Sequence, residues 1–150
     1  MTNDKAISIL NNLIETCKDG EQGFRTAADG LASPEITSKF HEFARERAQM
    51  SRDLQAEVRR LGGDPERSGS MAGAVHRGWL DIKSVVTGKD DHAILVEAER
   101  GEDVAKNAFE AALKESLPDS ALMLVQVEAA KVRHAHDYVR SLRDRQKVMK

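Results

Sequence analysis

The chain has 150 residues, of which 40% are hydrophobic and 32% charged, a composition that supports a folded core and is too polar for a membrane span. Its 23 Lys and Arg and 25 Asp and Glu residues give a formal net charge of −2, which argues against a general nucleic-acid binder with a basic surface. Only three prolines and ten glycines interrupt the chain. We therefore predict one all-α domain over residues 1–150, with an aliphatic, alanine-rich core.

The only cysteine, Cys17, cannot form an internal disulfide. Because it lies on an apolar stripe, we interpret it as a small buried hydrophobic residue rather than a reactive thiol. The first ten residues lack the basic start and long apolar run of a signal peptide. The expected location is a reducing cytoplasm.

A first helix is predicted to begin at residues 2–4, which are all of types favoured at an N-cap. Its apolar positions follow steps of three and four: Ile7, Leu10, Ile14, Cys17, Phe24, Ala28 and Leu31. Glu21 occupies the missing position of this stripe. Three glycines weaken the helix locally but would let a neighbouring helix or bulky side chain approach closely: Gly20, Gly23 and Gly30.

A second helix is predicted from Pro34, because Ser33 suits the N-cap and proline suits the first helical position. Its apolar face carries Ile36, Phe40, Phe43, Met50, Leu54, Val58 and Leu61. Arg47 fills the gap in this face between Phe43 and Met50. Gly62 and the following Gly-Asp-Pro segment end the helix.

Residues 64–90 are predicted to form a long crossover that runs back along or across the helices and contains a shorter helix. Its apolar positions are Met71, Val75, Trp79, Ile82 and Val86. His76 and Arg77, next to the only tryptophan, could line an anion or partner site. We favour a capping segment in which Trp79 is a substantially buried anchor and the flanking charges face solvent.

A third helix is predicted over about residues 90–116, with Glu102 beside its apolar line. The other acids of the segment EAERGED are Glu97, Glu99 and Asp103. We interpret them as a solvated acidic face, although Glu97 or Glu99 could turn inward in a shifted register.

A fourth helix is predicted over residues 121–142, with its apolar stripe at Leu122, Val125, Ala129, Val132 and Val139. His136 is the one polar residue on this stripe. A titratable side chain on a buried helix face needs a hydrogen-bond or ion-pair partner, or it has a functional role. His134 and Asp137 fall off the stripe, and we expect them in solvent or at an interface.

Two helical hairpins joined by one long crossover form the ferritin-like four-helix arrangement, in which the second and third helices can run parallel. At about 1.5 Å of rise per residue, one polar residue from each helix falls in the middle third of the bundle. The predicted central polar layer consists of Glu21, Arg47, Glu102 and His136.

This layer lies where ferritin-like carboxylate proteins hold two metal ions, but the usual Glu-x-x-His pairs are missing. Arginine cannot lose its proton, so Arg47 would repel a dication and compete for the carboxylates. We therefore favour an ion-pair layer in which Glu21 and Glu102 hold Arg47 between them and His136 bonds to one carboxylate. The alternative is a single metal ion, iron or manganese, on Glu21, Glu102 and His136.

Two segments carry a resemblance to a known family: GSMAGAVHRGWLDIKSVVTGKDDHAILVEAERGEDVAKNAFEAAL and VRHAHDYVRSLRD. The chain resembles, over nearly its whole length, an uncharacterised bacterial family of ferritin-like four-helix-bundle proteins described as a domain of unknown function. The resemblance implies the ferritin-like fold, and it supplies neither an activity nor a ligand motif.

Two hypotheses follow for the function. The leading one is a non-enzymatic, cytoplasmic interaction or stress-related module with a degenerate metal site and no cofactor, whose partner is a second copy or an unidentified protein. The rival is a metal-binding ferritin-like oxidase or metal-storage protein with a di-iron or mononuclear site. Neither nucleic acid nor membrane is expected as a partner.

Overall fold

The computed structural model describes residues 3–65 and 76–149, with the side chains of residues 76–77 and 146–149 left aside. All regular structure within these ranges is helical, as the composition predicted. The elements are α1 (Asn3–Gly30), α2 (Pro34–Arg60), η1 (His76–Trp79), α4 (Ile82–Thr87), α5 (Asp91–Leu113) and α6 (Asp119–Met149). None of these helices has the length and apolar character that crossing a bilayer requires.

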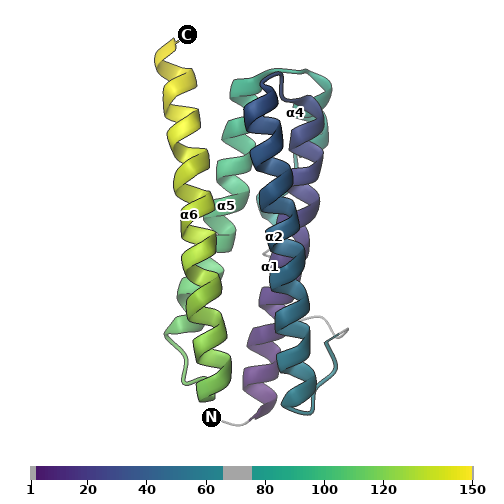
Figure 1. Cartoon of the computed structure of the whole chain (residues 1–150), viewed down its shortest axis with the longest axis vertical. Coiled ribbons are helices and arrows are strands. Elements are labelled where there is room, and N and C mark those ends of the chain that lie inside the picture. The colour runs from purple at the N-terminus through teal and green to yellow at the C-terminus, as the bar shows by residue number, and fades with distance from the viewer. Residues whose placement is uncertain (1–2, 66–75, 150) are drawn as a thin grey trace.

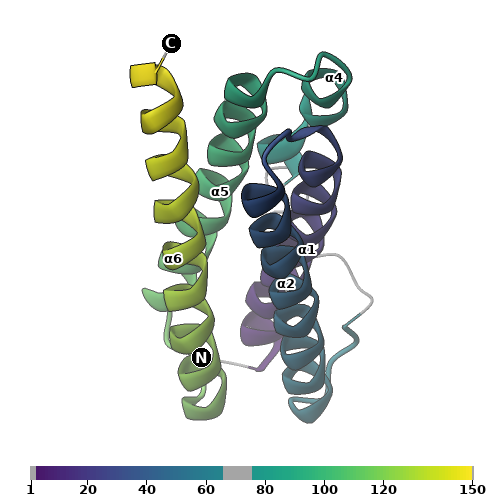
Figure 2. The same ribbon diagram turned by 45° about the horizontal axis from the view of Figure 1, so that its top comes forward.

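The four long helices form two antiparallel hairpins, α1 with α2 and α5 with α6 (Figure 1). Helix α1 also packs against α5, and α2 against α6. The crossover returns the chain to the end where α1 meets α2, so α2 and α5 run in the same direction. Figure 2 shows α4 at that end, beside the start of α5. The two hairpin loops therefore lie at opposite ends of the molecule.

Local sequence signals set the helix boundaries. The Ser33 hydroxyl accepts a hydrogen bond from the Ile36 N–H at 3.3 Å, and Pro34 is the first residue of α2. Gly62, just beyond the end of α2, has a φ of 89°, a left-handed conformation that glycine adopts without a steric penalty. The Asp90 carboxylate caps α5 by accepting from the His92 N–H at 3.0 Å. The predicted starts of α2 and α5 are confirmed.

The buried apolar side chains form two clusters, one toward each end of the molecule. One contains Leu10, Leu54 and Phe109, and the other contains Phe24 and Ile94. On α1, α2 and α5 the clusters are separated by a stretch of five or six residues that belongs to neither. The polar layer described below occupies that interval, so it divides the core into two halves.

Trp79 closes the side of the molecule between α1 and α5. Its side chain is 9% exposed, and its ring lies 5.2 Å from that of Phe24 in an edge-to-face arrangement. A Cβ atom added at Gly23 of α1 or at Gly101 of α5 would lie only 2.2 Å or 2.3 Å from the Trp79 ring. Both glycines are therefore needed for this packing. The prediction that Trp79 is a buried anchor is confirmed, whereas Met71 and Val75 of the predicted crossover helix lie outside the described residues.

Replacing Trp79 with alanine should lower the free energy of unfolding by about 3 to 5 kcal/mol, because the side chain leaves a cavity between two helices. Urea denaturation of both proteins measures the loss. Leu80→Ala is the matched control, since Leu80 is 67% exposed and should change stability by less than about 0.5 kcal/mol. Equal losses in the two variants would show that Trp79 does not anchor the crossover.

Candidate functional site

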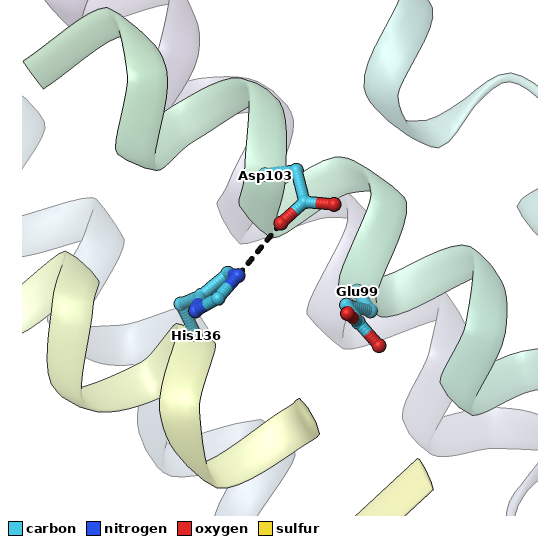
Figure 3. Close-up of side chains that lie close together, drawn as sticks. All are labelled: Glu99, Asp103 and His136. Atoms are coloured by element: carbon cyan, nitrogen blue, oxygen red, sulfur yellow. Dashed lines mark hydrogen bonds and ion pairs between the residues drawn. The ribbon is translucent and has the colours of Figure 1, made fainter. Parts of the chain in front are cut away.

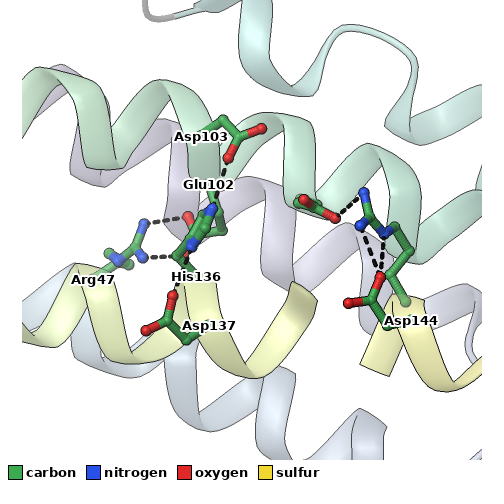
Figure 4. Close-up of polar contacts among 8 residues, drawn as sticks. Arg47, Glu102, Asp103, His136, Asp137 and Asp144 are labelled. Carbon is green, nitrogen blue, oxygen red and sulfur yellow. Dashed lines mark hydrogen bonds and ion pairs between the residues drawn. The ribbon is translucent and has the colours of Figure 1, made fainter. Parts of the chain in front are cut away.

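The centre of the molecule holds a buried ion pair between α2 and α5. Arg47 is 1% exposed and Glu102 is fully buried. The Arg47 Nη1 donates to Glu102 Oε2 at 2.9 Å, and Nη2 donates to Oε1 (Figure 4). Two parallel N–H donors on two carboxylate oxygens form the bidentate geometry of an ionised pair. The sequence predicted both residues and their contact.

The Arg47 side chain reaches this position because α1 has a glycine opposite it. A Cβ atom at Gly20 would lie 2.5 Å from Arg47 Nη1, so no larger residue fits there without a shift. The guanidinium carbon lies 5.4 Å from the centre of the Phe24 ring, within cation–π range. Small residues on α1 were predicted to admit a bulky neighbour, and Gly20 does so here.

The structure places Glu21 outside the central layer. Its carboxylate pairs with Arg25, one turn along the same helix, at 2.7 Å on a half-exposed face. The physical reason is rotation, because one residue along a helix turns the side chain by about 100° and Gly20 already faces Arg47. The prediction that Glu21 and Glu102 hold Arg47 between them is therefore wrong. Glu21, Glu102 and His136 do not converge on a common point either, since each has a different partner.

His136 is buried between the carboxylates of Asp103, which the sequence analysis placed in solvent, and Asp137, which it placed in solvent or at an interface. Its Nε2 lies 2.6 Å from Asp103 Oδ1 of α5, and its Nδ1 lies 3.0 Å from Asp137 Oδ1 (Figure 4). Both aspartates are exposed, as predicted, but their inner oxygens face the ring. The hydrogen bond with His136 is the main cause that lowers the pKa of Asp137. His136 therefore has its carboxylate partners, but neither of them is Glu21 or Glu102.

The acidic face of α5 is not solvated as predicted. Glu97 is buried under the crossover, where its Oε2 accepts a hydrogen bond from the Asp81 backbone N–H at 2.6 Å. Glu99 is buried against α6, where its Oε2 lies 2.6 Å from Arg143 Nη1. Both sides of α5 are therefore covered by other parts of the chain. The alternative in which Glu97 or Glu99 turns inward is the correct one for both residues. The solvated interpretation holds for Asp103, which is exposed.

Glu128 of α6 is a buried acid that the sequence analysis did not select. Within the described part of the chain, neither of its carboxylate oxygens has a hydrogen-bond partner. Burial, followed by the charge of Asp53, raises the pKa of the Glu128 carboxyl to about 8, against the opposing charges of Lys131 and Arg47. Burial also raises the pKa of the nearby Cys17 thiol, and the Glu128 charge adds to this effect. Cys17 is thus a buried, unreactive thiol, as its stripe position indicated.

A signal in the sequence could have found Glu128. The buried positions of α6 follow strict alternating steps of four and three: Ala121, Val125, Glu128, Val132, Ala135, Val139 and Leu142. The predicted stripe placed Ala129 and His136 at the centre of the buried face. In the structure, the residues one position earlier, Glu128 and Ala135, occupy that centre. His136 is still buried, but it lies at the flank that meets α5.

The central residues do not match a di-metal ligand set. Glu102 uses both oxygens on Arg47, a cation that cannot be deprotonated. Glu128 is the other buried acid near Arg47 among the described residues, and its raised pKa favours the protonated form at neutral pH. A dication at the centre would have to displace the guanidinium from Glu102. Of the crossover residues, His76 and Arg77 have side chains outside the described part of the structure.

Comparison with known protein families gives one finding. A family model described as Domain of unknown function (DUF2383) matches residues 5–115, which include α1, α2, η1, α4 and α5 except for the first two residues of α1. Arg47, Glu102 and Trp79 all lie within the matched segment, and Glu128 and His136 lie beyond it. No curated protein matches the chain.

Replacing Glu128 with glutamine should stabilise the protein and change its pH dependence. The folded chain keeps the Glu128 proton up to about pH 8, whereas the unfolded chain loses it near 4.5. The folded state therefore binds more protons in this window, and the free energy of unfolding falls as pH rises, by up to about 1.4 kcal/mol per pH unit. Glu128→Gln should remove this slope and gain about 3 kcal/mol at pH 7.

Urea denaturation at several pH values between 5 and 8 measures this difference. Glu110→Gln is the matched control, because Glu110 lies on α5 and forms a solvent-accessible ion pair with Arg133. An exposed pair of this kind contributes about 1 kcal/mol or less. If Glu128→Gln and wild type showed the same slope, the Glu128 carboxyl would not be held protonated by the fold.

Proposed function

We propose, from the premise that the chain belongs to the DUF2383 family, that it is a non-enzymatic ferritin-like four-helix bundle that acts by associating with protein. Two antiparallel hairpins joined by a long crossover, with α2 and α5 parallel, support the ferritin-like assignment. The family description assigns no activity, so the function must be argued from the site.

The observation that carries the proposal is the Arg47–Glu102 pair. Ferritin-like metal enzymes hold their ions at the centre of the bundle, on carboxylates and histidines that face inward from four helices. Here the inward carboxylate Glu102 is neutralised by the buried guanidinium of Arg47. The rival function, a di-iron or mononuclear oxidase or storage protein, would need a central carboxylate free to bind an ion, and Glu102 already has both oxygens on Arg47. Because the centre is filled by a structural ion pair, we place the functional contacts on the outer surface.

Exposed apolar residues on the outer face of α6 support the proposal that the protein binds another protein chain. Met123 is 67% exposed and Val127 is 56% exposed, and they lie one helical turn apart on the same face. Together they form a small exposed apolar patch that contact with another chain would remove from water. A second copy of the chain is the partner we propose. A cytoplasmic location and a stress-related role stay predictions.

The proposal predicts that protein purified without chelator carries far fewer than two iron or manganese ions per chain. The reason is that Arg47 occupies the position in which two ions would share Glu102. Elemental analysis of the purified protein measures the content. A value near two iron or manganese ions per chain would contradict the proposal and favour the oxidase or storage function.

The same preparation tests the association. We expect light scattering coupled to gel filtration to show a dimer for wild type and a monomer for the Met123→Glu, Val127→Glu double variant. Leu80→Glu is the control, because Leu80 is equally exposed but lies on the crossover rather than on α6. A monomeric wild-type chain at the highest accessible concentration would rule out self-association.

A further inference from the structure

A cluster of potential metal ligands lies in the seam between α5 and α6, apart from the central ion pair. Glu99 and Asp103 are four residues apart, so both face the same side of α5. His136 faces them from α6 (Figure 3). One ligand atom from each of the three residues lies within 4.8 Å of those of the other two. Glu102 is adjacent in sequence to Asp103, but it points into the core and pairs with Arg47.

We propose that Glu99, Asp103 and His136 bind one divalent transition-metal ion in this seam. An imidazole with two carboxylates suits zinc and its neighbours in the first transition row, whereas calcium and magnesium prefer sites made of oxygen alone. Three protein ligands leave a fourth position open for water or for a ligand from a partner. The site does not depend on the proposed function, because none of its ligands belongs to the central pair.

His136 is already oriented for this role. Its Nδ1 lies 3.0 Å from Asp137 Oδ1, which points the opposite nitrogen, Nε2, toward Asp103. Histidines that bind metals usually donate their second ring N–H to a carboxylate or carbonyl, which fixes the ring and raises its basicity. Asp137 provides this outer contact. Burial of the His136 ring further restricts its rotation, so the imidazole already has the orientation that binding through Nε2 requires.

Glu99 is a buried acid whose carboxylate could exchange its present partner for a metal ion. It is only 8% exposed, and its buried Oε2 accepts no hydrogen bond among the described residues, although Arg143 Nη1 lies 2.6 Å away as an ionic contact. A buried carboxylate oxygen normally accepts at least one hydrogen bond. The ion pair with Arg143 is thus the one contact that holds this oxygen among the described residues, and a metal ion could take the place of the guanidinium.

Two small movements complete the site. Ligand atoms around a tetrahedral zinc ion lie about 3.5 Å apart. Glu99 must therefore move about 1 Å toward the other two ligands, whereas Asp103 Oδ1, now 2.6 Å from His136 Nε2, must move about 1 Å away from it. Asp103 is exposed and can rotate. Arg143 must release Glu99, and it has an alternative partner because its Nη2 already lies 2.8 Å from Asp144 Oδ1. The guanidinium can therefore keep an ion pair while the carboxylate of Glu99 binds the ion.

Zinc titration of the chelator-treated chain tests the proposal, with calorimetry for stoichiometry and Co²⁺ absorption for the ligand geometry. We expect one ion per chain. Asp103→Asn should weaken Zn²⁺ binding at least about tenfold, as should Glu99→Gln, because each removes a charged ligand. Asp103 is exposed, so its variant should fold normally. Glu110→Gln, on the same helix, is the matched control and should bind like wild type.

Absence of Zn²⁺ binding up to about 1 mM would overturn the proposal, since such an affinity corresponds to only about 4 kcal/mol. Binding that is unchanged in Asp103→Asn would also overturn it, because the ion would then sit elsewhere. Neither result bears on the proposed function. Conversely, two iron or manganese ions per chain that persist in Asp103→Asn would contradict the proposed function, because those ions would be held at the centre and not in the seam.

Discussion

The buried guanidinium of Arg47 is the constraint on which the centre of this molecule depends. An arginine cannot give up its charge, so burying it requires a carboxylate in bidentate contact and space for a long side chain. Glu102 provides the first and Gly20 provides the second. The two apolar clusters lie on either side, so the pair is shielded from water in both directions along the helices. A change at any of these three positions affects the other two.

A pair of this kind fixes the arrangement of helices more than it adds to stability. Desolvating two charges costs about as much as their attraction returns, so an apolar pair of equal volume would often be as stable. What the pair enforces is register, because Arg47 meets Glu102 only when α2 and α5 are aligned at one height. Glu128 shows the opposite case. It is a buried acid with no hydrogen-bond partner among the described residues, and the fold accommodates it by raising the pKa of its carboxyl, which favours the protonated form.

The sequence was sufficient to predict the long helices and their main capping signals. It identified Arg47 from a gap in an apolar stripe and Glu102 from its position beside one. The prediction of buried positions was wrong where the apolar pattern is equally compatible with a stripe shifted by one residue. Glu21 was chosen although Gly20 faces the core, and the predicted stripe of α6 passed over Glu128. Each error is a rotation of about 100°, which only the neighbouring helix resolves. The burial of Glu97 could not be foreseen, because it depends on where the crossover packs.

The seam between α5 and α6 differs in character from the rest of the core. The α1–α2 hairpin is joined largely by apolar side chains, whereas α6 meets α5 partly through His136, Asp103 and the Glu99–Arg143 pair. Charged contacts at a half-open seam are more sensitive to ions and to pH than apolar contacts are. This is the part of the molecule where binding of an ion can change how firmly one helix is held.

A double-mutant cycle on Arg47 and Glu102 tests most directly whether the centre is a closed ion pair. Arg47→Met and Glu102→Gln should each lower the free energy of unfolding by about 3 to 5 kcal/mol, because each strands a buried polar partner. The double variant should lose at least about 2 kcal/mol less than the sum of the two, since nothing is then left unpaired. Losses that simply add would contradict the pairing and leave Glu102 free to serve another ligand.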